Sequence, residues 1–82
     1  MEAKKMNFFY DRKGDVLYIS IGSPQQAISR EVGEDILIRV HPDNDEVVGF
    51  TLFNFAERFS NIHEERSIPL SAQLHILNEM VT

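Results

Sequence analysis

Two aspartates near the N-terminus form the pattern in this sequence that most resembles a chemical site. Asp11 and Asp15 are four residues apart in the stretch YDRKGDVLYISI, residues 10–21, which also contains Tyr18. A carboxylate pair at this spacing can bind a metal ion or divide the roles of general acid and base. One hypothesis is therefore a small-ligand-binding or enzymatic domain that uses Asp11, Asp15 and Tyr18 in a cleft.

The same stretch also has the composition of a β-hairpin. Strand-like segments at residues 7–11 and 15–21, rich in aromatic and β-branched side chains, flank Arg12-Lys13-Gly14. A three-residue loop that ends in glycine is typical of a type I turn followed by a left-handed residue. In such a turn the Asp11 carboxylate accepts hydrogen bonds from nearby backbone amides. We therefore favour a structural hairpin, with Gly14 in the left-handed position, over a catalytic pair.

Other residue types give no motif for catalysis, a metal or a cofactor. His41, His63 and His75 are too far apart for the close ligand spacing of zinc sites, and the acidic turn at residues 43–46 lacks the pattern of a calcium loop. The chain has no cysteine, and its four glycines are scattered singly, so no phosphate-binding loop is present. We expect no cofactor, no metal and no catalytic residue, which favours a protein that is not an enzyme.

The rest of the chain predicts a single α+β domain over residues 1–82. Alternating apolar residues at 35–41 and 46–53 indicate two further strands, with a weaker strand at 26–32. Short strands joined by tight turns favour an antiparallel meander, here of four strands without the weaker segment at 26–32. Gly49, inside the last of these strands, indicates a bulge or the close approach of another backbone.

A helix should follow the sheet. Asn54 is placed to cap it, and Glu57 three residues later completes a capping-box arrangement. Phe55, Phe59 and Ile62 fall on one helical stripe, which we expect to pack on the sheet.

The C-terminal extension, residues 67–82, has two interpretations. Strict alternation of apolar residues from Ile68 to Ile76 predicts a strand, whereas a stripe that includes Leu70, Leu74 and Val81 also fits a helix. We favour the strand and keep the helix as the alternative. A terminal strand can pair within its own sheet or with a second copy, so Leu70, Leu74 and Ile76 are candidates for a homodimer contact.

Negative charge is concentrated in the middle of the chain. The protein has a net charge of −5, and residues 31–66 hold nine acidic and three basic side chains, a net charge of −6. A chain without a basic stripe is poorly suited to phosphate binding, so we do not expect a nucleic acid as partner. An acidic segment suits a basic protein partner. The candidate surface for that partner consists of Glu34, Asp35, Asp43, Asp45 and Glu46.

The sequence gives no reason to expect a membrane location. No apolar run approaches the roughly 20 residues of a membrane-spanning helix. The charged N-terminal segment lacks the apolar core of a signal peptide. With no cysteine present, a cytoplasmic location is the expectation.

Several of these residues carry a resemblance to a known family. Tyr10-Asp11, then Asp15 with Leu17-Tyr18-Ile19, and later residues 46–50 resemble a small prokaryotic family known as domain of unknown function 2283, over about residues 7–60. This sequence departs from the family pattern where Thr51 replaces a glutamate, Phe50 replaces an isoleucine, and Asn44-Asp45 replaces a turn that ends in glycine. The resemblance implies a sheet-plus-helix fold in a bacterial or archaeal cytoplasm and brings no assigned activity. Similar proteins are sometimes encoded beside toxin-like proteins, which implies an antitoxin-like role as one version of the interaction hypothesis.

Two functional hypotheses follow from the sequence. The first is a self-associating protein-interaction module, most simply a homodimer, that binds a basic protein partner. The second is the ligand-binding or enzymatic domain at the hairpin. The position of the hairpin carboxylates distinguishes the two hypotheses. In the second they converge on a cleft, whereas otherwise they are used within the turn itself.

Overall fold

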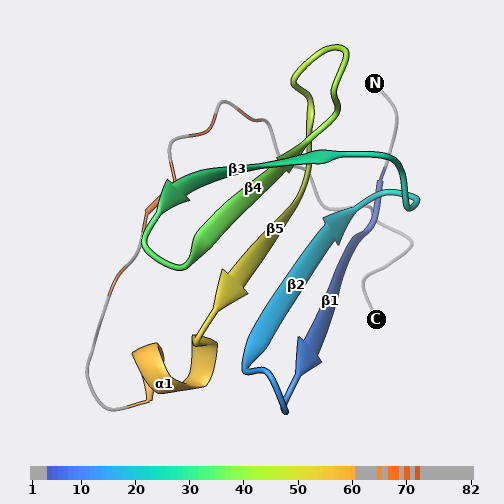
Figure 1. The fold of residues 1–82 in the computed structure, drawn as a ribbon. Helices are drawn as coiled ribbons and strands as arrows, with labels where there is room; N and C mark the ends of the chain where they lie inside the picture. Colours follow the sequence, from blue (N-terminus) through green and yellow to red (C-terminus); the bar gives the residue numbers. More distant parts are fainter. Residues whose placement is uncertain (1–3, 61–64, 66, 69, 71, 73–82) are drawn as a thin grey trace.

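The protein forms one antiparallel sheet of five strands followed by a short helix (Figure 1). The structure is a computed structural model, and it describes residues 4–60, 65, 67–68, 70 and 72. The elements are β1 (Met6–Asp11), β2 (Val16–Ile21), β3 (Ile28–Gly33), β4 (Ile36–Val40), β5 (Val47–Phe53) and α1 (Phe55–Phe59). The α+β class predicted from the sequence is confirmed.

The strand order departs from a sequential meander at one point. The order across the sheet is β1-β2-β5-β4-β3, so β5, and not β3, lies beside β2. The chain leaves β2 through Gly22, at a φ of 79°, and crosses to the far edge before β3 begins. The three strands β3, β4 and β5 then form a meander that returns to the centre. The segment predicted as a weak strand is a full edge strand, so the sheet has five strands and the prediction of a four-stranded meander is wrong.

The sequence pattern of β3 is weak because this strand lies at the edge of the sheet. Every residue of β3 except Gly33 is exposed, because nothing in the described part of the chain covers either face of this edge. Alternation of apolar and polar residues arises where one face of a strand is buried. By contrast, β4 alternates buried Ile36, Ile38 and Val40 with half-buried Leu37 and Arg39, and its prediction was clear.

The hydrophobic core lies on one face of the sheet. Directly opposed residues share a face, so the register places Phe8, Ile19, Phe50 and Ile38 in one row on this side, which we call the core face. Ile38, Val40 and Phe50 form its buried centre, and Ile68 packs against them from beyond the helix. The other side, which we call the opposite face, carries the row of Phe9, Tyr18, Thr51 and Leu37.

Gly49 allows β5 to approach β2 closely, as the sequence predicted. A Cβ atom built on Gly49 would lie 2.5 Å from the backbone oxygen of Ile19. The register between β4 and β5 also shifts beside it, between Arg39 and Val40. A residue without a side chain is therefore required at this point in the central strand.

The helix differs from the prediction in its length, its cap and its packing. It lies at one end of the sheet (Figure 1), and none of its residues is buried. It has five residues, and Ile62, the third member of the predicted apolar stripe, lies outside the described residues. Phe55 and Phe59 do lie together, with ring centroids 5.4 Å apart. Asn54 has a left-handed backbone, with φ of 54°, and its side chain makes no capping hydrogen bond. The predicted Asn54–Glu57 capping box is therefore wrong, and another residue supplies the cap.

The predicted C-terminal strand falls mostly outside the described residues. Of residues 68–76, only Ile68, Leu70 and Ala72 are described, and none of the three lies in a helix or strand. Ile68 contacts the core, while Leu70 and Ala72 help to line a cavity of about 630 Å³ on the core face.

Candidate functional site

The Asp11 carboxylate is used within its own turn. Its Oδ1 atom accepts hydrogen bonds from the backbone N–H groups of Lys13, at 3.1 Å, and Gly14, at 3.4 Å. This arrangement is the one expected for an aspartate that begins a tight turn. It gives Asp11 a structural role in closing the β1–β2 hairpin.

The left-handed residue of the hairpin is Asp15, and not Gly14 as the sequence predicted. β1 ends at Asp11 and β2 begins at Val16, so the loop spans residues 12–15 and is one residue longer than expected. Asp15 has φ of 56°, whereas Gly14 does not have a positive φ. Aspartate is among the few residue types other than glycine that tolerate this conformation.

Asp15, in the β1–β2 hairpin, supplies the cap of α1, which begins at the same end of the sheet. Its Oδ1 accepts from the backbone N–H of Ala56 at 2.7 Å, and its Oδ2 accepts from that of Glu57 at 3.1 Å. Its own carbonyl oxygen accepts from the N–H of Phe55 at 3.1 Å. The first N–H groups of a helix have no partner within the helix, so a carboxylate placed here satisfies them.

Tyr10 completes the environment of this carboxylate. Its hydroxyl donates to Asp15 Oδ1 at 2.5 Å, and its ring packs edge-on against Phe55, with centroids 6.0 Å apart. The hydrogen bond from Tyr10, followed by that from the Ala56 amide, lowers the pKa of Asp15. The same bond to Asp15 raises the pKa of Tyr10. Tyr10, Asp15 and the start of α1 therefore form a structural anchor.

The hairpin residues do not converge on a cleft. Asp15 is engaged with Tyr10 and α1, whereas Tyr18 lies on the opposite face, 42% exposed, with its ring stacked 6.1 Å from that of Phe9. No group of three acidic, histidine or cysteine side chains within the described ranges could hold a metal ion. The geometry does not support the ligand-binding or enzymatic hypothesis.

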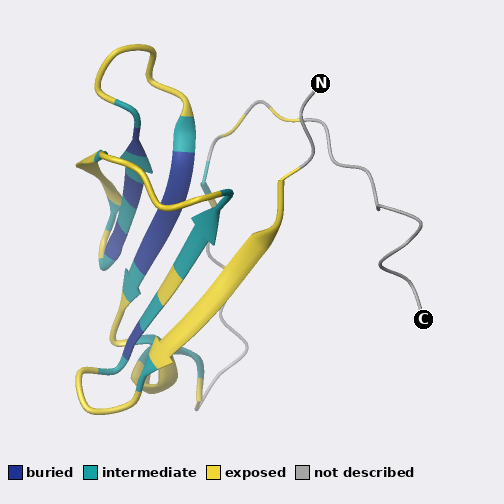
Figure 2. Ribbon diagram, turned by 90° about the vertical axis from the view of Figure 1, so that its right-hand side faces the viewer, coloured by how far each residue is buried: buried dark blue, intermediate teal, exposed yellow. Residues whose placement is uncertain are grey.

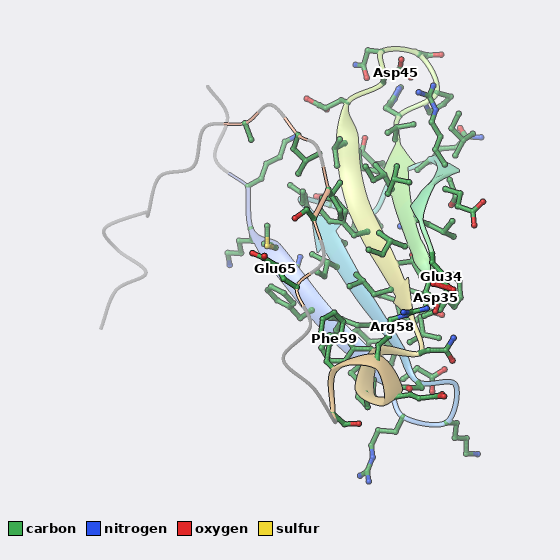
Figure 3. All side chains as sticks on the ribbon, turned by 90° about the vertical axis from the view of Figure 1, so that its left-hand side faces the viewer. Glu34, Asp35, Asp45, Arg58, Phe59 and Glu65 are labelled. Carbon is green, nitrogen blue, oxygen red and sulfur yellow. The ribbon has the colours of Figure 1, made fainter. Side chains whose placement is uncertain are left out.

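The acidic residues predicted to bind a basic partner mostly pair with cations of this chain, as Figure 3 shows for Glu34 and Asp35 beside Arg58. Arg58 of α1 lies 3.0 Å from Glu34 and 2.8 Å from Asp35, and its hydrogen bond to Asp35 raises its pKa. At the other end of the sheet, Asp45 pairs with Arg30 at 2.7 Å. Glu46 pairs with Lys4 at 3.5 Å. These four carboxylates do not form one uncompensated acidic surface.

The loop between β4 and β5 uses its polar groups to define its own shape. His41 Nδ1 accepts from the Asp43 N–H at 3.1 Å, and Asn44 Oδ1 accepts from the Glu46 N–H at 2.9 Å. The side chain of Asp43 makes no ion pair with the described residues. His63 and His75 lie outside the described part of the chain, as do Leu74 and Ile76 of the predicted dimer contact.

The outer edge of β1 is a candidate surface that the sequence analysis missed. Gly22 N–H donates to the Lys5 carbonyl at 2.8 Å. Hydrogen-bonded pairs alternate along an antiparallel ladder, so the odd-numbered residues of β1 direct their backbone groups toward β2. The backbone N–H and C=O groups of Met6, Phe8 and Tyr10 consequently point away from the sheet.

Residues 6–10 of β1 are exposed, as the yellow ribbon of this strand shows in Figure 2, and four of the five are large apolar or aromatic residues. Phe8 is 63% exposed on the core face, and Phe9 is 65% exposed on the opposite face. Met6 and Tyr10 are also exposed large apolar side chains, and no charged residue lies between Met6 and Tyr10. The signal in the sequence was the run MNFFY, which has strand composition without the alternation of a half-buried strand.

The edge at β3 is different. It carries Arg30 and Glu31, and its register shifts between Glu31 and Gly33. Charged side chains and bulges are the devices by which edge strands avoid pairing with other chains. The two edges of this sheet are therefore unequal, and only β1 lacks these features.

A comparison with known families gives a match that covers most of the described residues. The model of a family described as protein of unknown function (DUF2283) matches residues 7–55. The chain belongs to the DUF2283 family. The DUF2283 match runs from β1 to the first residue of α1, so it contains the sheet and Asp15. No curated protein and no solved structure matches the chain.

Two departures from the DUF2283 pattern can be placed in the structure. Asp45 has φ of 59°, so it takes the left-handed conformation that glycine adopts without strain. Thr51, where the resemblance implies a glutamate, is 6% exposed and lies opposite Tyr18 in the register of β2 and β5. Within the described residues, no helix is long and apolar enough to cross a membrane.

Proposed function

We propose that this DUF2283 protein is a protein-interaction module that self-associates, with the outer edge of β1 as its docking surface. One observation carries the proposal: β1 combines exposed apolar side chains with backbone groups that point away from the sheet. An edge strand of this kind is a ready template for a strand of another chain. Adding a strand satisfies the outward N–H and C=O groups and removes apolar surface from water.

A basic protein partner is a second proposal, with an antitoxin-like role in the cytoplasm as its most concrete form. Its support is the net charge of −6 over residues 31–66. The ion pairs of Glu34, Asp35, Asp45 and Glu46 with Arg58, Arg30 and Lys4 reduce the charge available to such a partner. Self-association through β1 is therefore the function that the geometry supports best.

A pair of lysine substitutions tests the docking surface. Phe8→Lys places a charge at the centre of β1, where the side chain is largely exposed and its replacement leaves the core intact. Ile28→Lys is the matched control, because Ile28 is also an exposed residue of an edge strand, β3. Circular dichroism verifies that both variants fold.

Sedimentation velocity over micromolar to millimolar protein concentrations then gives the oligomeric state. We expect wild type and Ile28→Lys to form dimers and Phe8→Lys to remain monomeric. A wild-type protein that is monomeric at every concentration would overturn the proposed function. Dimers of equal strength in both variants would show that self-association uses a surface other than β1.

A further inference from the structure

We infer that two copies of the chain join their β1 strands antiparallel about a two-fold axis at Phe8, which makes one continuous ten-stranded sheet from two five-stranded ones. This inference rests on the proposed function and specifies its geometry: the partner is a second copy, and Phe8 faces Phe8. A two-fold interface is self-complementary, so a strand can pair with itself only antiparallel about a central residue or residue pair.

The backbone limits the possible registers. Only the even-numbered residues of β1 direct N–H and C=O groups outward, so an even-numbered residue must face an even-numbered residue of the second copy. Two registers pair most of the strand under this condition. One is centred on Phe8 and pairs residues 6–10 of each copy, and the other is centred on Phe9 and pairs residues 7–11.

Charge separates these two registers. Centring on Phe8 places Lys5 directly opposite Asp11 of the second copy, and Lys4, which already pairs with Glu46 of its own chain, opposite Arg12; symmetry repeats both pairs at the other end. Centring on Phe9 places Lys5 opposite Lys13 of the second copy instead. Opposite charges across a strand pair stabilise it and like charges destabilise it. Lys5 makes no ion pair with the described residues of its own chain, and Asp11 uses Oδ1 in its turn, which leaves Oδ2 to face Lys5 of the second copy.

The side-chain rows also fit the register centred on Phe8. On the core face the two Phe8 side chains are neighbours, and each Tyr10 lies opposite Met6 of the second copy. Aromatic pairs and sulfur–aromatic contacts both stabilise such rows. On the opposite face, each Phe9 lies opposite Asn7 of the second copy. The four exposed apolar residues of β1 thus each gain a neighbour from the second copy, in addition to the contacts of Phe9 with Tyr18 and of Tyr10 with Phe55 in the single chain.

Single-cysteine cross-linking tests the register, because the protein has no cysteine of its own. A hydrogen-bonded pair in antiparallel strands has Cα atoms about 5.5 Å apart, within the range of a disulfide. We expect Phe8→Cys to form a disulfide-linked dimer under mild oxidation. Met6→Cys is the matched control, since the two Met6 residues are displaced by four residues, about 13 Å along the strand, and should not cross-link.

A charge reversal gives an independent test, because the register decides whether the reversal weakens or strengthens the dimer. Lys5→Glu would face Asp11 of the second copy, and we expect the dimer dissociation constant to rise on the order of tenfold. Lys13→Glu, with the same change of charge, should leave it nearly unchanged. If Phe9 were the centre, Lys5→Glu would instead face Lys13 and strengthen the dimer.

The outcomes separate the register from the proposed function. Cross-linking of Phe8→Cys together with weakening by Lys5→Glu supports the inference. A dimer that cross-links through Phe9→Cys, or through neither phenylalanine position, overturns the register while self-association stands. A wild-type chain that is monomeric throughout removes both.

Discussion

The Tyr10 hydroxyl donates a 2.5 Å hydrogen bond to Asp15 Oδ1, and the same oxygen accepts the Ala56 N–H at 2.7 Å. One carboxylate therefore joins the edge strand β1, the hairpin loop and the start of α1, although Asp15 and Ala56 are 41 residues apart in the chain. A helix of five residues is too short to be stable alone, so its position depends on such contacts.

Removing the Asp15 carboxylate should loosen α1 and lower stability. Asp15→Gly deletes the carboxylate without conflict with the φ of 56°, whereas Asp15→Asn keeps one oxygen acceptor and tolerates the same backbone. We expect thermal midpoints in the order wild type, Asp15→Asn, Asp15→Gly, with the last lowered by roughly 4–8 °C, as for the loss of a helix cap. Equal midpoints for wild type and Asp15→Gly would show that the cap contributes nothing.

The same anchor should make stability depend on pH at both extremes. The pKa of Asp15 is lowered from 3.8, so its contribution is fully present above that ordinary value and is lost as pH falls through the lowered pKa. The pKa of Tyr10 is raised from 10.0, so its contribution is present below pH 10.0 and is lost as pH rises through the raised pKa. Denaturant midpoints measured against pH should show a shallower acid limb for Asp15→Asn and a shallower alkaline limb for Tyr10→Phe. Curves parallel to wild type in both variants would contradict this assignment.

The two glycines of the sheet and hairpin should respond differently to alanine. At Gly49 a Cβ would lie 2.5 Å from the Ile19 backbone oxygen, so Gly49→Ala must displace β2 or β5 and should destabilise the protein by about 1–3 kcal/mol. At Gly14 the nearest atom would be Asp11 Oδ2 at 3.1 Å, the end of a side chain, and φ is not positive. Gly14→Ala should therefore change stability by only about 0.5 kcal/mol or less. Urea denaturation of the two variants measures the contrast, and equal losses would refute it.

The elements that depend on local pattern were predictable from the sequence. The alternation of Ile36, Ile38 and Val40 identified β4, and the position of Gly49 indicated the close approach of two backbones. The turn role of Asp11 also followed from residue type and spacing. Each of these features is decided within a few residues of chain.

The features that depend on distant partners were not predictable. Asn54 has the residue type of a cap, but Asp15 occupies the capping position because the strand order brings the hairpin beside the start of α1. The interaction of Arg58 with Glu34 and Asp35 likewise joins α1 to the turn between β3 and β4. Four of the five acidic residues that suggest a free surface in the sequence are paired in the fold.

The unequal edges of the sheet depend on topology in the same way. A run such as MNFFY has the composition of a strand at any position in a sheet. Only the strand order shows that it forms an outer edge. Once that position is known, the exposure of Phe8 and Phe9 becomes a feature that needs a partner.

Amide hydrogen exchange at Phe8, measured by NMR at several protein concentrations, tests self-association through β1 most directly. The Phe8 N–H points away from β2, so it is open to solvent in a single copy and hydrogen-bonded in the paired dimer. The account predicts that its exchange slows as concentration rises, while the inward Phe9 N–H is protected at every concentration. Rapid exchange of Phe8 at a concentration where the protein is dimeric would contradict docking through β1.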